Sequence, residues 1–222
     1  SSTSRGLGDV YKRQVVAMTE EGRITDIDEK PLETNLSTVS TGIYVIRRRL
    51  LIELLEKAAE EDRHEFVRDI LVRYKNIKKI YGYKLDTYWS NISTVDSYYR
   101  TNMDFLKKDV RDYFFKQYPD VYSKVEDLPP AKYNFGANVR NSLVSSGCIV
   151  NGTVEDSVLF KKIYVGNNSV IKNSIILNNV YIGDNAYIEN CIVESNSTIK
   201  ANSRYVGENG TRIVVEDSPL YY

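Results

Sequence analysis

Aliphatic and polar positions alternate with a fixed period in the carboxyl-terminal part of the chain, over residues 148–209. A four-residue motif consists of Asn or Asp, then Ser or Cys, then two aliphatic residues, and its copies begin at Asn141, Asp156, Asn173 and Asn190. The first two copies are fifteen residues apart, and the later steps are seventeen residues each. A period of this kind, with aliphatic residues at equivalent positions, is typical of a solenoid.

Within each coil of this solenoid the aliphatic positions are five or six residues apart. These positions are Val165, Ile171, Ile176, Ile182, Ile188, Val193 and Ile199. Glycine or asparagine lies near the expected corners, at Gly166, Gly183, Asn178 and Asn179, and both residue types tolerate a positive φ. The rhythm therefore predicts three short strands per coil, which is a parallel β-helix. The 3.6-residue period of helical repeats is absent from this part of the sequence.

Upstream of the repeat, the apolar pattern predicts a mixture of strands and helices. A hairpin is expected over 15–19 and 24–27, further strands over 39–46 and 77–85, and helices over 47–61, 66–74 and from residue 95 onward. Ser93 or Thr94 is expected to cap the last helix, with Asp96 at capping-box distance from Ser93.

The same pattern divides the chain into four regions. Residues 1–14 lack an apolar period and an initiating Met, so we expect a leader foreign to the fold. Residues 15–110 form a first domain, 111–131 a linker that ends near Pro129-Pro130, and 132–222 the β-helix domain.

Composition and charge narrow the possible partners. The chain has 222 residues with 30 Lys and Arg against 30 Asp and Glu, so no overall field favours nucleic acid or an anionic membrane. No apolar run approaches the roughly 20 residues of a membrane span. The two cysteines, Cys148 and Cys191, both lie in the repeat and are expected to be buried free thiols. A reducing cytoplasm fits this pattern.

The ordered set of motifs carries a family resemblance. The chain reads D-x-x-E-K-P from Asp26, S-T-G-I-Y-V-I from Ser40, Y-W-S-N-I-S-T-V-D-S-Y-Y-x-x-N from Tyr88, and P-P-A-K-Y from Pro129, before the repeat. Over residues 15–209 this resembles the carboxyl-terminal half of bacterial ADP-glucose pyrophosphorylase, which is glucose-1-phosphate adenylyltransferase. The resemblance implies the carboxyl-terminal half of a Rossmann-like nucleotidyltransferase domain (α/β), followed by an all-β left-handed parallel β-helix of hexapeptide repeats.

The resemblance also assigns sugar-phosphate contacts. Glu29 and Lys30 match the family's Glu-Lys-Pro motif, in which the lysine meets the sugar phosphate, and an ammonium group is a compact charge suited to phosphate. Ser40 and Gly42 match the strand that lines the sugar site. Without the resemblance, Lys30 would be interpreted as a surface turn residue, and Ser40 and Gly42 as parts of an ordinary strand with a bulge.

One departure from the family motif concerns the metal. Catalytic members read Trp-Arg-Asp-Val-Gly-Thr where this chain has Trp89 to Thr94, so Asn91 replaces the Asp that binds the catalytic Mg²⁺. Magnesium favours charged carboxylates. The segment from Phe66 to Asp69 reads Phe-Val-Arg-Asp where relatives have Phe-Gly-x-Asp, and no glycine-rich nucleotide loop precedes a helix. We therefore expect no catalytic residue and no bound metal in this chain alone.

These departures are typical of a regulatory subunit in glycogen biosynthesis. Its partner would be a catalytic paralogous chain that holds Mg²⁺, in a hetero- or homo-oligomer, which is a tetramer in the family. One alternative is an active single-subunit adenylyltransferase. Another is a hexapeptide-repeat acyltransferase, but many of these use a histidine between coils as general base, and the only histidine here is His64. A purely structural assembly module is compatible with the regulatory interpretation.

Overall fold

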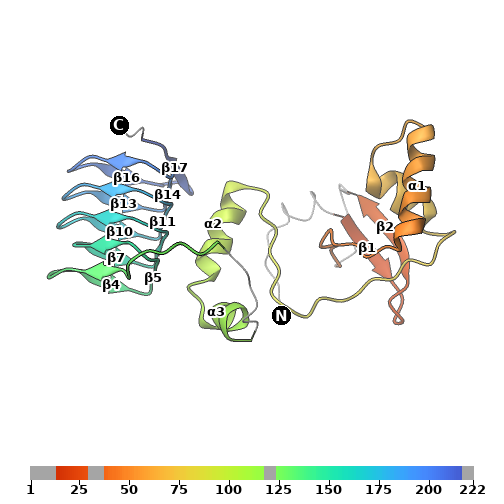
Figure 1. The fold of residues 1–222 in the computed structure, drawn as a ribbon, viewed down its shortest axis with the longest axis horizontal. Coiled ribbons are helices and arrows are strands. Elements are labelled where there is room, and N and C mark those ends of the chain that lie inside the picture. The colour runs from red at the N-terminus through yellow and green to blue at the C-terminus, as the bar shows by residue number, and fades with distance from the viewer. Residues whose placement is uncertain (1–13, 30–37, 118–123, 217–222) are drawn as a thin grey trace. The chain divides into compact units, whose positions relative to one another are not determined.

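The computed structural model describes residues 14–29, 38–117 and 124–216. The chain divides into two compact units, residues 1–89 and residues 90–222. Figure 1 labels the main elements of each unit.

The first unit is built on an antiparallel hairpin. Strand β1 (Gln14–Met18) pairs with strand β2 (Ile24–Glu29), as the alternating pattern predicts. In the described part of this unit the helical elements are the α-helix α1 (Arg48–Glu60) and the π-helix η2 (Phe66–Val72). Ile24 and Ile27 of β2 pack with Leu71 of η2 in a small core.

Helix α1 confirms the predicted amphipathic stripe in part. Leu54 and Ala58 are buried, whereas Leu55, from the same predicted stripe, is 46% exposed. The second predicted helix is present, but most of it has π rather than α geometry.

The predicted strands over 39–46 and 77–85 are wrong for the part of the chain that the structure describes. Each contributes an isolated bridge, Val39 with Val15 and Tyr81 with Arg23, and the rest is extended or irregular. A strand requires a continuous ladder with a neighbour, and each of these segments has one bridge to the hairpin region. Some of their apolar side chains are exposed, among them Val45 (99%) and Tyr83 (92%).

The second unit begins with three helical elements. These are α2 (Val95–Asp104), α3 (Lys108–Asp112) and the π-helix η3 (Tyr113–Gln117). Thr94 is the N-cap of α2, and the capping box is completed by Ser97, so the predicted partner Asp96 is wrong. Residues 111–117, the first part of the predicted linker 111–131, are helical.

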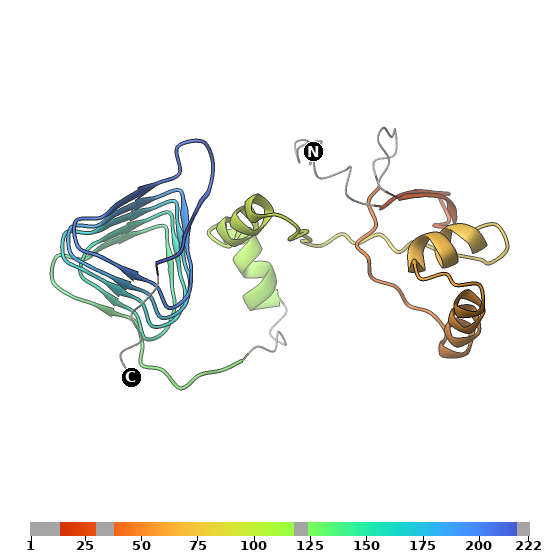
Figure 2. The same cartoon turned by 90° about the horizontal axis from the view of Figure 1, so that it is seen from above.

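Residues 132–214 of the second unit form a β-helix of three parallel sheets, each five-stranded. One sheet has the order β3 (Lys132–Tyr133), β6 (Ile149–Val150), β9 (Tyr164–Val165), β12 (Tyr181–Ile182) and β15 (Thr198–Ile199). The next has β4 (Asn138–Arg140), β7 (Thr153–Glu155), β10 (Val170–Lys172), β13 (Tyr187–Glu189) and β16 (Arg204–Val206). The last has β5 (Leu143–Val144), β8 (Val158–Leu159), β11 (Ile175–Ile176), β14 (Cys191–Val193) and β17 (Arg212–Val214). Viewed along its axis, the coil is triangular (Figure 2).

The interior of the triangle confirms the predicted aliphatic rhythm. The seven positions predicted to point inward are all fully buried: Val165, Ile171, Ile176, Ile182, Ile188, Val193 and Ile199. Burial of each such side chain stabilises the fold by about 1.5–3 kcal/mol. Cys148 and Cys191 are free and buried in the same core, and burial raises the pKa of both thiols. The fold is thus a small α/β unit followed by helical elements and a parallel β-helix.

The corners of the coil differ from the prediction in one respect. Asn179 has the expected positive φ, of 59°. Gly166 and Gly183 have no positive φ; they are required because the next coil approaches them closely. A Cβ on Gly183 would lie 2.6 Å from the backbone nitrogen of Ala201.

No helix within the described ranges is long and apolar enough to cross a membrane.

Candidate functional site

Two of the residues predicted to contact the sugar phosphate lie at one end of the hairpin. Glu29, the last residue of β2, pairs with Gln14, the first residue of β1. The N–H of Ser40 donates to the carbonyl of the same Gln14 at 3.0 Å. The backbones of Glu29 and Ser40 therefore flank Gln14. The side chain of Glu29 and the whole of Lys30 lie outside the described residues.

Ser40 and Gly42 form a turn in place of the predicted strand. Gly42 has φ +75°, and its N–H donates to the hydroxyl of Ser40 at 3.2 Å. Apart from its chain neighbours, no heavy atom of the residues that the structure describes lies within 4 Å of the position that a Cβ would take on Gly42. The glycine is therefore explained by its backbone conformation, since a left-handed φ favours glycine.

Two further residues line the same place and are not predicted from the sequence. The hydroxyl of Tyr44 donates to Oε1 of Gln14 at 2.8 Å, and the Tyr44 ring lies 5.3 Å from the ring of Phe66. The sequence assigns Gln14 to the foreign leader, yet it is part of β1. Tyr44 belongs to the S-T-G-I-Y motif, which is the available signal for it.

The groups that the structure describes in hydrogen bonds around Gln14 are neutral. An amide, an aliphatic hydroxyl, a phenol and backbone N–H groups are donors and acceptors suited to sugar hydroxyls. Phosphate binding would require a cation as well, which is the role that the family resemblance gives to Lys30.

Asn91, the predicted replacement of the metal-binding Asp, is held within its own loop. Its Nδ2 donates to the hydroxyl of Ser93 at 3.1 Å, and the N–H of Ser93 donates to Oγ of Ser97 in α2 at 3.0 Å. The amide side chain thus contributes a hydrogen bond that a carboxylate could not donate. Within the ranges that the structure covers, no group of three or more His, Cys, Asp or Glu side chains is arranged to hold a metal ion.

Asp69, from the altered Phe-Val-Arg-Asp segment, is 3% exposed. It accepts hydrogen bonds from the N–H of Glu65 at 3.0 Å and from Nε of Arg68 at 3.1 Å. The hydrogen bond from Arg68, supported by the Glu65 N–H, holds the pKa of Asp69 below its usual value, although burial opposes the shift. In its ionised form Asp69 therefore accepts the backbone N–H of Glu65, the residue just before η2.

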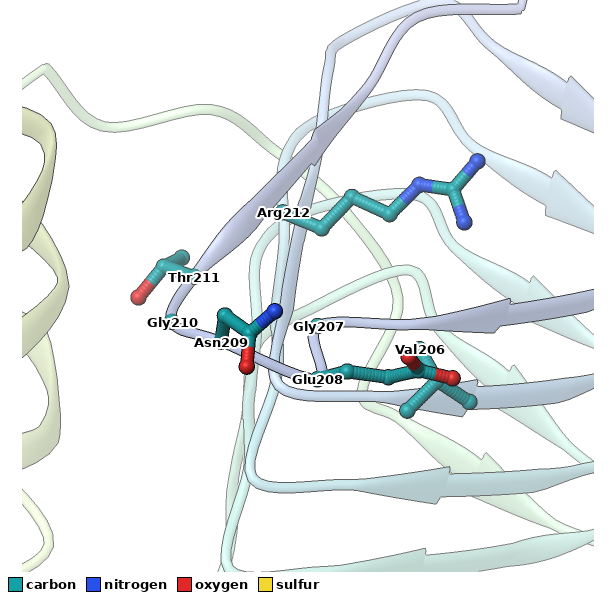
Figure 3. A pocket seen from close by; sticks show the side chains of 7 residues that line it. All are labelled: Val206, Gly207, Glu208, Asn209, Gly210, Thr211 and Arg212. Carbon is teal, nitrogen blue, oxygen red and sulfur yellow. The ribbon is translucent and has the colours of Figure 1, made fainter.

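A hollow of about 440 Å³ lies elsewhere, in the last turn of the β-helix. It is formed by residues 206–212, between β16 and β17, and includes no predicted site residue. Figure 3 shows the charged side chains of Glu208 and Arg212 extending to the same side of this loop. His64 lies outside the β-helix; it is exposed, with Nε2 2.9 Å from Oδ1 of Asp62.

Comparison with protein families matches both parts of the chain. Residues 14–108 match the family described as nucleotidyl transferase. Residues 129–212 match the family described as GlmU-like, C-terminal hexapeptide.

Similar proteins named glucose-1-phosphate adenylyltransferase come from several bacteria. The one from Desulfitobacterium hafniense (strain Y51) is 33% identical over 67% of this chain and 38% of its own length. Those from Thermosipho melanesiensis and Bacillus subtilis (strain 168) are each 34% identical over 74% of this chain, and over 40% and 44% of their own lengths. The chain spans about two fifths of the length of the curated relatives it matches.

Proposed function

We propose that this chain works in a glucose-1-phosphate adenylyltransferase as a subunit of the regulatory type, with little activity of its own. The reaction of the complex would be ATP plus glucose 1-phosphate giving ADP-glucose and pyrophosphate, in glycogen biosynthesis. The names of the similar proteins support the nucleotidyltransferase class. The observation that carries the regulatory assignment is Asn91, whose neutral side chain is hydrogen-bonded within its own loop.

The chemistry of Mg²⁺ supports this assignment. A hard cation that holds transferred phosphates is bound by carboxylates, and an Asn offers one uncharged carbonyl oxygen. In the proposed complex Mg²⁺ is therefore held by the catalytic partner chain, where it stabilises phosphoryl charge. This chain keeps the sugar-side elements, namely Glu29, Lys30, Ser40 and Gly42, and would retain weak affinity for glucose 1-phosphate.

The partner would be a paralogous catalytic chain in the cytoplasm, in a tetramer of the kind that the family forms. The sheet faces and coil ends of the β-helix provide surface for this assembly. Neither nucleic acid nor a membrane is a partner in this proposal, in line with the balanced charge.

Co-expression tests the proposal. The chain is produced with and without a catalytic paralogue that has Asp at the position of Asn91, and ADP-glucose formation is measured over a range of effector concentrations. We expect no appreciable activity from this chain alone and a changed effector response in the co-purified pair. An unchanged response would contradict the regulatory role.

The Asn91→Asp variant distinguishes the second candidate, an active single-subunit enzyme. If the chain is already active alone and Asn91→Asp leaves this activity unchanged, the single-subunit interpretation holds. If the variant gains activity only in the presence of the nucleotide-binding half of a relative, Asn91 is the residue that removes catalysis.

A further inference from the structure

Helix α2 is fixed on the outer face of the β-helix. The outward-facing aliphatic residues of β8, β11 and β14 are Val158, Ile175 and Ile192, and the residues packed against them from the α2 region are Tyr98, Tyr99, Met103 and Leu106. The contact buries Ile175 completely and leaves Ile192 only 4% exposed, although both point away from the interior of the coil. The hydroxyl of Tyr99 also donates to the carbonyl of Asn173 at 2.5 Å.

Two polar residues of α2 are buried as well. Ser97 is 4% exposed and Thr101 is 9% exposed, and they lie one helical turn apart. Buried polar groups are almost always hydrogen-bonded, because an unpaired one costs free energy. The partners described for these two hydroxyls lie mainly in residues 90–94, the segment just before the helix.

The contacts are specific. Oγ of Ser97 accepts the N–H groups of Ser93 at 3.0 Å and of Thr94 at 2.9 Å. Oγ1 of Thr101 lies 2.6 Å from Oγ of Ser90. Capping of α2 needs only the reciprocal pair of Thr94 and Ser97. The bonds from Ser93 and to Ser90 go beyond that requirement and hold the segment along its length.

We infer that Ser97 and Thr101 are positioning residues: they fix the 90–94 segment, and with it Asn91, on a helix that the β-helix holds in place. The conformation around Asn91 is then set by packing on the outer face of β8, β11 and β14. The regulatory meaning of this link rests on the proposed function, because it gives the β-helix a physical connection to the loop that matches the family's metal-binding loop. The link itself is a property of the isolated chain.

Hydrogen exchange tests the link without any assay of catalysis. The amides of Ser93 and Thr94 are the probes, and Ile192→Ala, under α2, is compared with Ile149→Ala, which changes the same side chain on another sheet where it is 38% exposed. We expect Ile192→Ala to accelerate exchange at both amides at least about tenfold, and Ile149→Ala to leave it unchanged. Equal exchange in the two variants, with the β-helix circular dichroism intact, would overturn the inference.

A second pair of variants tests Thr101 directly. Trp89 is the only tryptophan of the chain and precedes Ser90, so its fluorescence reports on this segment. Thr101→Val, which loses the hydroxyl at nearly constant shape, should shift Trp89 emission, and Thr101→Ser should restore it. If Val and Ser give the same spectrum as Thr, the positioning role is wrong.

If Ile192→Ala prevents folding, Tyr99→Phe replaces it, since that variant removes only the hydrogen bond to Asn173. The expected and contradicting results at Ser93 and Thr94 are then the same. These measurements use the chain alone, so their failure is distinguishable from a failure of the co-expression assay.

Discussion

Asparagine provides most of the left-handed corners of the β-helix. Asn168, Asn185 and Asn202 have φ values of 56°, 57° and 61°, and they stack at an interval of seventeen residues. The Nδ2 of Asn168 donates to Oδ1 of Asn185 at 3.4 Å, and the Nδ2 of Asn185 donates to Oδ1 of Asn202 at 3.2 Å. Asn is favoured here because it tolerates this backbone region and because its amide both donates and accepts.

Substitution of the middle corner separates these two contributions. Asn185→Ala should lower the free energy of unfolding of the β-helix by about 1–2 kcal/mol, because Ala lacks the side-chain amide that lets Asn adopt the left-handed region, and because both ladder bonds are lost. Asn185→Gly also loses the ladder hydrogen bonds, but glycine adopts a left-handed φ without strain. This variant should therefore lower the free energy of unfolding by less than Asn185→Ala does. Urea denaturation followed by circular dichroism measures both, and equal losses would contradict the importance of φ.

Asp112 in α3 provides a titratable contact at the residue scale. Hydrogen bonds from Lys108 at 2.7 Å and then from Lys116 lower the pKa of this carboxyl from 3.8 to about 2. Because the pKa is depressed in the folded state, the stabilisation is fully present above the unfolded value. It is lost as the pH falls through the folded pKa.

We therefore expect α3 and η3 to loosen between about pH 4 and pH 2, and the effect to weaken in high salt, since these groups are exposed. Carboxyl NMR titration and amide exchange of residues 108–116 measure this change. Asp112→Asn should remove the step, while Asp109→Asn, in the same helix, serves as the control. A midpoint near 4 for Asp112 would contradict the ion pairs.

At the scale of elements, periodic and isolated patterns differ in what they predict. A β-helix strand finds its partner one repeat away, so the period that predicts the strand also predicts its neighbours, as Ile171 beside Ile188 demonstrates. The apolar segments 39–46 and 77–85 specify a preference for a sheet and nothing about a partner. Each therefore forms only an isolated bridge in the described chain.

The candidate site follows the same logic. The motifs pointed to Glu29, Ser40, Gly42 and Asn91. Ser40 and Gly42 share a hydrogen bond at the end of the hairpin, and Asn91 makes one just before α2. Conformation was not predictable from them, because the Ser40–Gly42 turn is held in place by the bond from the Ser40 N–H to Gln14, which is distant in the sequence. The assignment of Glu29, Lys30, Ser40 and Gly42 to sugar phosphate stays a prediction.

Glycine in the coils gives a further prediction for this element. A Cβ on Gly183 would meet backbone atoms of the next coil, and backbone cannot move aside like the end of a side chain. We expect Gly183→Ala to lower the free energy of unfolding by about 1–3 kcal/mol. Thermal and urea unfolding measure the change, and the exposed neighbour substitution Lys200→Ala should leave stability within about 0.5 kcal/mol. A loss no larger than that of Lys200→Ala would contradict the close approach.

At the scale of the whole molecule, the compact units divide at Trp89 and Ser90, whereas the predicted domain boundary lies after residue 110. The reason is α2, whose sequence continues the first domain's motif but whose apolar face packs on the β-helix. The sequence pattern contains the aliphatic residues on both sides of this contact. It does not contain the information that Ile175 and Ile192, which alternate with interior residues, need a cover outside the coil.

Two fragments measure how strongly the β-helix depends on that cover. Residues 90–222 retain α2, and residues 132–222 leave Val158, Ile175 and Ile192 without it. A contiguous aliphatic stripe on a folded surface promotes association, so the shorter fragment should self-associate and bind a hydrophobic dye, and the longer one should do neither through this face. Light scattering after size exclusion and dye fluorescence measure both.

Ile175→Lys with Ile192→Lys in the shorter fragment should reduce association, because charge on the outer face repels a second copy and leaves the interior unchanged. A shorter fragment that is monomeric and binds no dye would contradict the role of α2 as the cover, and would favour the predicted boundary after residue 110 over the division at residue 89.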